Sequence, residues 1–182
     1  MYAQTYMTNF HAVSNALDLE SFQNGMDVVK AAWERGSNII TLGNGGSSMT
    51  ALHFNTDWTK MIYLATGKPF HGRSLVDNMG LIMAYANDVS FADVFSEQLK
   101  NVMREGDLVL AISGSGNSEN VIRAIDYAND NGGITLGLAG FGGGRLKEKS
   151  QHSVWVDSHD MQLVEDCHSM FGHMTMQYLT QK

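Results

Sequence analysis

The sequence predicts an α/β protein: a three-layer αβα sandwich whose central sheet has five parallel strands, preceded by two helices. Three observations carry this prediction. Strand-like runs alternate with helical stretches about five times along the 182 residues, which is typical of a parallel sheet covered by helices. Residues 107–112 form a nearly continuous apolar run, as expected for a strand covered on both faces. Glycines gather at the ends of these runs, where they mark turns.

The elements follow from the spacing of apolar residues. Helical spacing through residues 5–35 indicates two helices, and the β-rich run 38–42, which leads into a glycine, indicates the first strand. We expect the remaining elements in this order: helix 47–62, a weaker strand 71–75, one helix or two short ones over 79–103, strand 107–112, helix 118–130, strands 134–139 and 152–156, and helix 160–180.

Composition excludes several classes of protein. The 43% hydrophobic content argues against disorder, and a net charge of −7 argues against a protein that coats nucleic acid. The single cysteine, Cys167, excludes an internal disulfide framework and fits a reducing compartment. There is no apolar run of ~20 residues and no signal-like N-terminus, so we expect a cytoplasmic protein without a membrane partner. The low charged fraction, 17%, favours an oligomer.

The first glycine-rich loop, residues 43–48 (GNGGSS), follows the first predicted strand and precedes a helix. Its glycines allow close approach of a ligand, and the start of the helix favours an anion. The loop matches neither a dinucleotide-binding nor a Walker sequence, so no nucleotide cofactor is expected. A purely structural turn is the alternative.

The second loop, residues 113–118 (SGSGNS), has the same position after a strand. Its three hydroxyls and free backbone N–H groups are suitable donors for a phosphate monoester. Helix capping by Asn117 or Ser118 is the alternative. The loop contains no Lys or Arg, so a phosphorylated sugar suits it better than a polyphosphate.

Together these motifs resemble the sugar isomerase (SIS) domain family, and within it the phosphoheptose isomerases. The resemblance covers nearly the whole chain. It rests on GNGGS at 43–47, HF at 53–54, AND at 86–88, FADVF at 91–95, REGD at 104–107, ISGSGNS at 112–118, NVIRAI at 120–125, and EDCH with a later histidine at 165–173.

The resemblance implies a single SIS domain over residues 1–182 with a flavodoxin-like fold. Residues 1–35 would form oligomerisation helices and residues 36–182 the phosphosugar-binding core. It also implies a homotetramer that isomerises sedoheptulose 7-phosphate to D-glycero-D-manno-heptose 7-phosphate through an enediol or enediolate, and a zinc ion. The substrate-binding residues that it implies are Asn44, Gly45, Gly46, Ser47, Asn87, Asp88, Ser113, Gly114, Ser115 and Ser118.

His53 and Asp57 lie four residues apart, so they share one helix face, either as metal ligands or as a surface pair. The resemblance adds Glu165 and His173 to a possible zinc set of His53, Asp57, Glu165 and His173. Asp57 stands where the isomerases carry glutamate, and Glu165 where they carry glutamine. His168, between the last two, is either a supporting group or a packed histidine.

Aldose–ketose isomerisation needs a base over the reacting carbon and a group that shuttles the oxygen proton. The candidate base is Asp57 or Glu165, with His173 as its partner. On one helix Glu165 and His173 would lie about 12 Å apart along the axis. Either Glu165 therefore precedes the regular helix, or the ligands come from two chains.

Two other functions stay open at this point. One is a non-catalytic phosphosugar-binding SIS module that senses a ligand or holds a partner. The other is an isomerase of a different sugar phosphate, because the residues that face the middle carbons of the sugar cannot be identified from the sequence.

Overall fold

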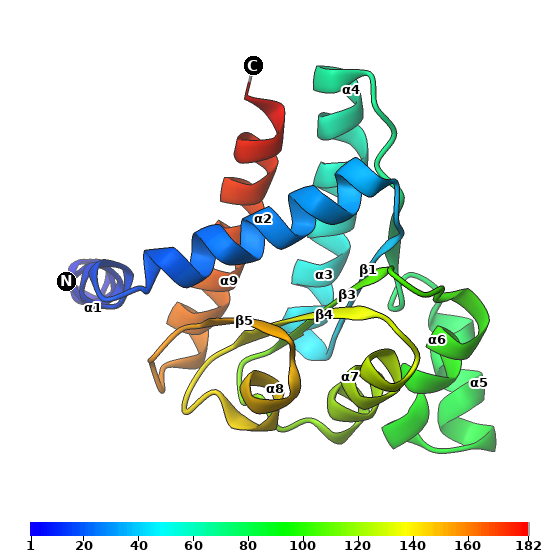
Figure 1. The fold of residues 1–182 in the computed structure, drawn as a ribbon. Coiled ribbons are helices and arrows are strands. Elements are labelled where there is room, and N and C mark those ends of the chain that lie inside the picture. The colour runs from blue at the N-terminus through cyan, green and yellow to red at the C-terminus, as the bar shows by residue number, and fades with distance from the viewer. Residues whose placement is uncertain (182) are drawn as a thin grey trace.

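The computed structural model describes residues 1–181 and has the predicted αβα architecture (Figure 1). Five parallel strands lie in the order β2-β1-β3-β4-β5, which is the order of flavodoxin-like sheets. The strands are β1 (Ile39–Gly43), β2 (Gly72–Ser74), β3 (Leu108–Ser113), β4 (Ile134–Ala139) and β5 (His152–Trp155).

Helices cover both faces of the sheet. In Figure 1, α2 (Leu19–Arg35), α3 (Gly45–Asp57) and α9 (Met161–Thr180) lie on one side, and α7 (Glu119–Asp130) and α8 (Gly144–Lys149) lie on the other. The remaining helical segments are α1 (Tyr2–Asn15), a π-helical turn (Trp58–Ile62), α4 (Tyr63–Thr66), α5 (Met79–Asp88), a 3-10 turn (Phe91–Asp93) and α6 (Ser96–Val102).

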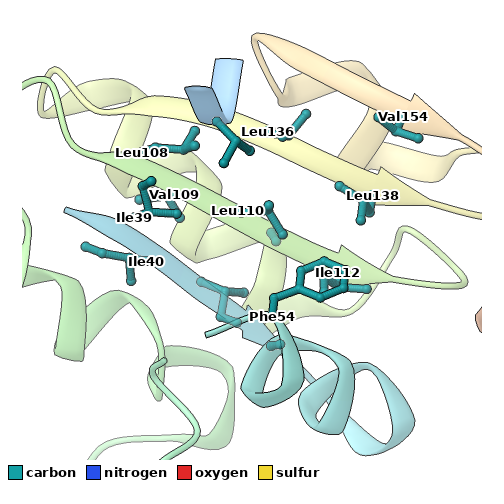
Figure 2. Packing of buried hydrophobic residues seen from close by; sticks show 14 of the residues in the cluster. Ile39, Ile40, Phe54, Leu108, Val109, Leu110, Ile112, Leu136, Leu138 and Val154 are labelled. Atoms are coloured by element: carbon teal, nitrogen blue, oxygen red, sulfur yellow. The ribbon is translucent and has the colours of Figure 1, made fainter. Parts of the chain in front are cut away.

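The core lies between the sheet and its two helical layers. Every residue of β1 and β3 is buried, as expected for central strands of a parallel sheet. Figure 2 shows strand side chains such as Ile40, Leu110 and Leu138 together with Phe54, which α3 contributes to the same cluster. This rigid centre fixes the positions of the loops at the strand ends.

The two N-terminal helices differ in their packing. Asp18 caps α2 by accepting hydrogen bonds from two backbone N–H groups, and Gly36 ends it with a left-handed φ of 74°. The apolar face of α2, including Phe22 and Val29, is buried in the core. In contrast, α1 has no buried residue among those described, and Tyr6 donates a hydrogen bond of 2.6 Å to Asp166 of α9. Of the two helices, α1 is the one that buries none of its described apolar side chains.

Two features were not expected from the sequence. The helix expected over 47–62 begins at Gly45 and passes into the π-helical turn at Trp58. The glycine-rich segment after β4 leads into the short helix α8, which the apolar spacing did not indicate. No helix within residues 1–181 is both long enough and apolar enough to cross a membrane.

The sheet order also determines where a ligand fits. The order of strands reverses between β1 and β3, and ligand crevices of open α/β sheets lie at the carboxyl ends of strands at such a point. Both glycine-rich loops begin there, because β1 ends at Gly43 and β3 at Ser113.

Candidate functional site

The two loops form one small polar cavity of about 150 Å³ at the carboxyl ends of β1 and β3, which we call the serine-loop pocket. Seven of the predicted site residues line it: Asn44, Ser47, Ser113, Gly114, Ser115, Ser118 and Glu165. Two residues that the sequence analysis did not single out, Ile112 and Met161, complete the wall.

The serine hydroxyls are arranged to donate to a ligand. The Ser113 Oγ accepts a hydrogen bond from the Gly116 N–H (3.2 Å), and the Ser115 Oγ accepts one from the Asn117 N–H (3.3 Å). Neither hydroxyl donates a hydrogen bond to any other residue in 1–181, so both protons remain for a ligand. Three hydroxyls on one wall of a cavity are a donor set for an anion such as phosphate.

The capping alternative does not account for these side chains. Ser118 stands at the N-cap of α7, but within residues 1–181 its side chain makes no capping hydrogen bond. The Asn117 amide bonds the Ser115 carbonyl and the Arg145 N–H instead. The Ser118 hydroxyl is therefore available to a ligand.

The first loop is tied to α7 by a pair of amides. Asn44 and Asn120 exchange two side-chain hydrogen bonds, of 2.8 and 2.9 Å, and Asn120 is almost fully buried. Gly45 has a φ of +53° and lines a neighbouring apolar cavity of about 250 Å³ that shares Asn44 with the serine-loop pocket. The amide pair holds the two loops at a fixed separation.

Glu165 projects from α9 onto the start of α3. A Cβ atom at Gly46 would meet its carboxylate, so the Glu165 side chain keeps this position only beside glycine and would have to move for any larger residue. Glu165 lies within the regular helix α9, which excludes the possibility that it precedes the helix. Its carboxylate faces the partly positive N-terminus of α3.

A second cluster lies further along the same two helices. The Nε2 atoms of His53 and His173 are 2.9 Å apart, and the Asp57 Oδ2 lies 3.4 Å from the His53 Nε2. One ligand atom from each of the three residues lies within 4.8 Å of the other two. Two imidazoles and a carboxylate are the donor types of a three-ligand catalytic zinc site, so this cluster fits that metal chemically. Glu165 is not a member of the group.

The packing between α3 and α9 brings the two histidines together. The Trp58 indole N–H donates a buried hydrogen bond of 2.9 Å to the Gly172 carbonyl. The Phe54 ring lies directly against Gly172, where a Cβ atom would collide with it. Phe54 stacks on Trp58 with ring centroids 4.8 Å apart. These contacts fix the register in which His53 meets His173.

Asn87, Asp88 and His168 lie outside both the serine-loop pocket and the cluster of His53, Asp57 and His173. Asn87 and Asp88 end α5, where both are exposed and the Asn87 amide donates to the Asp88 carboxylate (2.7 Å). Neither residue lines the serine-loop pocket. His168 is buried on α9, and neither of its ring nitrogens makes a well-formed hydrogen bond with any described residue. Burial lowers the pKa of His168 to about 4, although the Ala139 carbonyl opposes part of this shift.

The comparisons with known proteins agree with this geometry. Residues 2–140 match the SIS domain family. A protein of Thermoplasma acidophilum named "Probable phosphoheptose isomerase" is 33% identical over 182 residues, the full length of both chains. The phosphoheptose isomerase of Campylobacter concisus is 35% identical over 87% of this chain and 84% of its own. This chain belongs to the phosphoheptose isomerase family of SIS-domain proteins.

Solved structures of the phosphoheptose isomerase family have the same fold. A phosphoheptose isomerase from Francisella tularensis superimposes with a TM-score of 0.90 at 24% identity, over 100% of this chain and 95% of that one. One from Neisseria gonorrhoeae gives the same TM-score at 23% identity, over 98% and 96% of the two chains. The flavodoxin-like SIS fold expected from the sequence is thereby confirmed.

Two residues that shape the site of this phosphoheptose isomerase family member, Met161 and Asn120, could not be recognised from the sequence. The Met161 sulfur lies over Gly114, where a Cβ atom would collide with it. Asn120 lies inside a quoted motif, but only the structure shows its pairing with Asn44. Each of these contacts joins segments that are far apart in the sequence, so no local sequence pattern indicates it.

Proposed function

We propose that this chain interconverts sedoheptulose 7-phosphate and D-glycero-D-manno-heptose 7-phosphate through an enediol or enediolate. The observation that carries the proposal is the serine-loop pocket, in which hydroxyl donors for a phosphate and the Glu165 carboxylate share one cavity. The full-length similarity to phosphoheptose isomerases supports the same reaction.

In this proposal the serine loop holds the phosphate end of the substrate. Ser113, Ser115 and Ser118 donate to the phosphate oxygens, with Gly114 and Ser47 beside them in the wall. Asn44, Gly45 and Gly46 contact the sugar, as do Asn87 and Asp88 at the end of α5. Fixing one end of the substrate in this way orients the reacting carbons and lowers the entropic part of the barrier.

The proposed proton-transfer groups are Asp57, Glu165 and His173. One carboxylate removes the proton from the carbon, and His173 moves the proton between the two oxygens. Glu165 and His173 are eight residues apart on α9, about 12 Å along the helix axis. This separation favours a working site that joins the serine-loop pocket of one copy to the histidine cluster of another.

We further propose that His53, Asp57 and His173 hold a zinc ion. Bound there, zinc would polarise the substrate carbonyl and stabilise the developing negative charge on oxygen. Glu165 would be a fourth ligand only if association of two chains brings it to the cluster. Metal analysis of the purified protein, together with loss of binding in His53→Ala, tests this assignment.

The proposal includes a homotetramer located in the cytoplasm. The exposed apolar side chains of α1 support association, and the unpaired, buried Cys167 fits a reducing compartment. Burial raises the pKa of the Cys167 thiol to about 11, so it stays unreactive at neutral pH.

The direct test is turnover of sedoheptulose 7-phosphate followed by NMR, with five- and six-carbon ketose phosphates in parallel. We expect the heptose 7-phosphate to form at the expense of the ketose, with the seven-carbon substrate preferred. Faster conversion of a shorter sugar would assign a different isomerase. Binding of all these phosphates without conversion would indicate a non-catalytic SIS module.

A further inference from the structure

We propose that Arg145, which lies outside the pocket, is a positioning residue that holds the serine loop in its phosphate-binding shape. The inference rests on the proposed function only in taking the serine loop as the phosphate site. Arg145 is the second residue of α8, the helix that the sequence did not indicate. It does not line the serine-loop pocket, so it would act through the loop and not by contact with the ligand.

The carbonyl groups of the serine loop provide the first argument. All four carbonyl oxygens of residues 114–117 accept hydrogen bonds from donors that do not line the pocket. An oxygen left free to turn inward would repel a phosphate. The donors, in order along the loop, are Gly140 N (3.1 Å), Asn117 Nδ2 (2.9 Å), Leu146 N (2.9 Å) and a guanidinium nitrogen of Arg145 (3.3 Å).

Of these four donors, Arg145 is the one side chain that reaches the loop from another segment. It also donates its backbone N–H to the Asn117 Oδ1 (3.2 Å), and the Asn117 amide in turn bonds the Ser115 carbonyl. Arg145 therefore supports two of the four carbonyls, one directly and one through Asn117.

The backbones of the two segments touch, so a shift of one is transmitted to the other. Gly116 has a φ of +65°, and a Cβ atom there would collide with the Gly143 carbonyl. At Gly144, with a φ of +57°, an added Cβ atom would lie 2.7 Å from both the Gly116 carbonyl oxygen and the Asn117 side-chain nitrogen. Contact of this closeness leaves little room between α8 and the loop, so the conformation of α8 determines that of the loop.

Charge provides a second, independent argument. Glu119 follows Ser118 directly, so an unpaired carboxylate there would oppose phosphate binding. Arg145 pairs with Glu119 at 2.7 Å, and Arg123 pairs with the same carboxylate at 3.2 Å. Both arginines lower the pKa of Glu119, and they neutralise its charge next to the loop.

The stability of the fold should depend little on Arg145. Its side chain is 41% exposed and that of Glu119 is 49% exposed, and ion pairs at such exposure contribute little to folding. A change in phosphate affinity without a change in melting temperature therefore separates positioning of the loop from general stabilisation.

The test compares wild-type protein with Arg145→Ala, Arg145→Gln and Lys149→Ala. Lys149 is the matched control, since it lies on the same helix and loses a similar exposed ion pair, with Asp126, that does not involve the loop. Affinity for inorganic phosphate is measured by titration calorimetry, KM and kcat with sedoheptulose 7-phosphate, and the melting temperature by circular dichroism.

We expect Arg145→Ala to weaken phosphate binding and raise KM by about tenfold, the effect of one charge-assisted hydrogen bond. Its kcat should stay within about twofold, as for loss of uniform binding. Its melting temperature should fall by no more than about 3 °C. Arg145→Gln keeps an N–H donor for the Asn117 carbonyl and should recover much of the lost affinity, whereas Lys149→Ala should bind phosphate normally.

Three results would overturn the inference: unchanged phosphate affinity in Arg145→Ala, an equal loss in Lys149→Ala, or no recovery in Arg145→Gln. An equal loss in Lys149→Ala would assign the effect to long-range charge, and no recovery in Arg145→Gln would assign it to the charge of Arg145 beside Glu119 and not to its hydrogen bond with the loop. If the wild-type protein bound neither phosphate nor the sugar phosphate, the proposed function itself would be wrong. The three results above would overturn only the role of Arg145 and would leave the proposed function intact.

Discussion

Ser118 occupies the N-cap position of α7, but its side chain makes no capping hydrogen bond with a described residue, so its hydroxyl is available to a ligand. We therefore predict that Ser115→Ala combined with Ser118→Ala weakens sugar-phosphate binding at least tenfold. The two hydroxyls donate to a charged acceptor, where each hydrogen bond is worth about 1.5–3 kcal/mol. Titration calorimetry checks this, and an unchanged dissociation constant would remove the serine loop from the phosphate site.

A second prediction at the level of single residues concerns the carboxylates of Asp57 and Glu165. Asp57→Asn and Glu165→Gln should each retain phosphate binding and slow turnover by about 10²–10⁴, the usual contribution of general acid–base catalysis. His173→Ala should do the same. The measurement is kcat beside the dissociation constant for the sugar phosphate.

Glu165→Gln is the more informative of the two variants, because the family resemblance implies glutamine at that position. If Glu165 only holds substrate or metal, the variant stays active and Asp57 is the base. Full activity in both Asp57→Asn and Glu165→Gln would exclude a carboxylate base at either position.

Single residues of the site could be predicted from sequence where a local pattern marks them. Ser113, Ser115 and Ser118 lie within one loop, and all three line the pocket as expected. The contacts of Met161 with Gly114 and of Arg145 with Asn117 depend on the folded arrangement of distant segments. The close approach of His53 to His173 likewise needs the packing of α3 on α9.

At the scale of elements, the packing of α3 on α9 depends on Gly172. We predict that Gly172→Ala destabilises the protein by about 1–3 kcal/mol, because the added methyl group overpacks the buried Phe54 ring. Urea unfolding measures the change. Gly142→Ala is the matched control, since a Cβ atom at Gly142 meets nothing within 4 Å, and equal stability of the two variants would contradict the packing argument.

The elements themselves were predictable in proportion to their length and periodicity. The strand expected over 134–139 matches β4, and the helix expected over 160–180 is α9 apart from its first residue. The six-residue α8 was missed because it is too short to show a helical repeat and follows the glycines at 140–144. The π-helical turn was hidden because one extra residue per turn leaves no local sequence signal.

At the scale of the whole molecule, stability should depend on the ionisation of His168. Its pKa is lowered to about 4 by burial, whereas an unfolded chain protonates histidine near its usual value of about 6.5. Above about pH 6.5, His168 is neutral in both the folded and the unfolded chain, so its ionisation does not reduce the free energy of unfolding. As the pH falls from about 6.5 toward 4, the unfolded state gains a proton that the folded state excludes, so stability decreases.

Urea unfolding at pH 7, 6 and 5 measures this dependence. His168→Leu should flatten the profile over that range, because the residue that takes up the proton is gone. His11→Gln is the control, since His11 is exposed on α1 and its replacement should leave the slope unchanged. A profile equally steep in His168→Leu and wild-type protein would assign the pH dependence to other groups.

The exposed apolar surface of the whole chain predicts association into a homotetramer with D2 symmetry. Tyr2 and Met7 of α1 are 83% and 47% exposed, and Tyr63 and Leu64 are exposed at the start of α4. Such side chains on one chain are the surface that a second copy would bury. Light scattering at micromolar concentration should give four times the 20.0 kDa chain mass. Deleting residues 1–16 should reduce the assembly. It should also lower turnover, because the proposed site joins two copies. A monomeric wild-type protein with full activity would contradict both expectations.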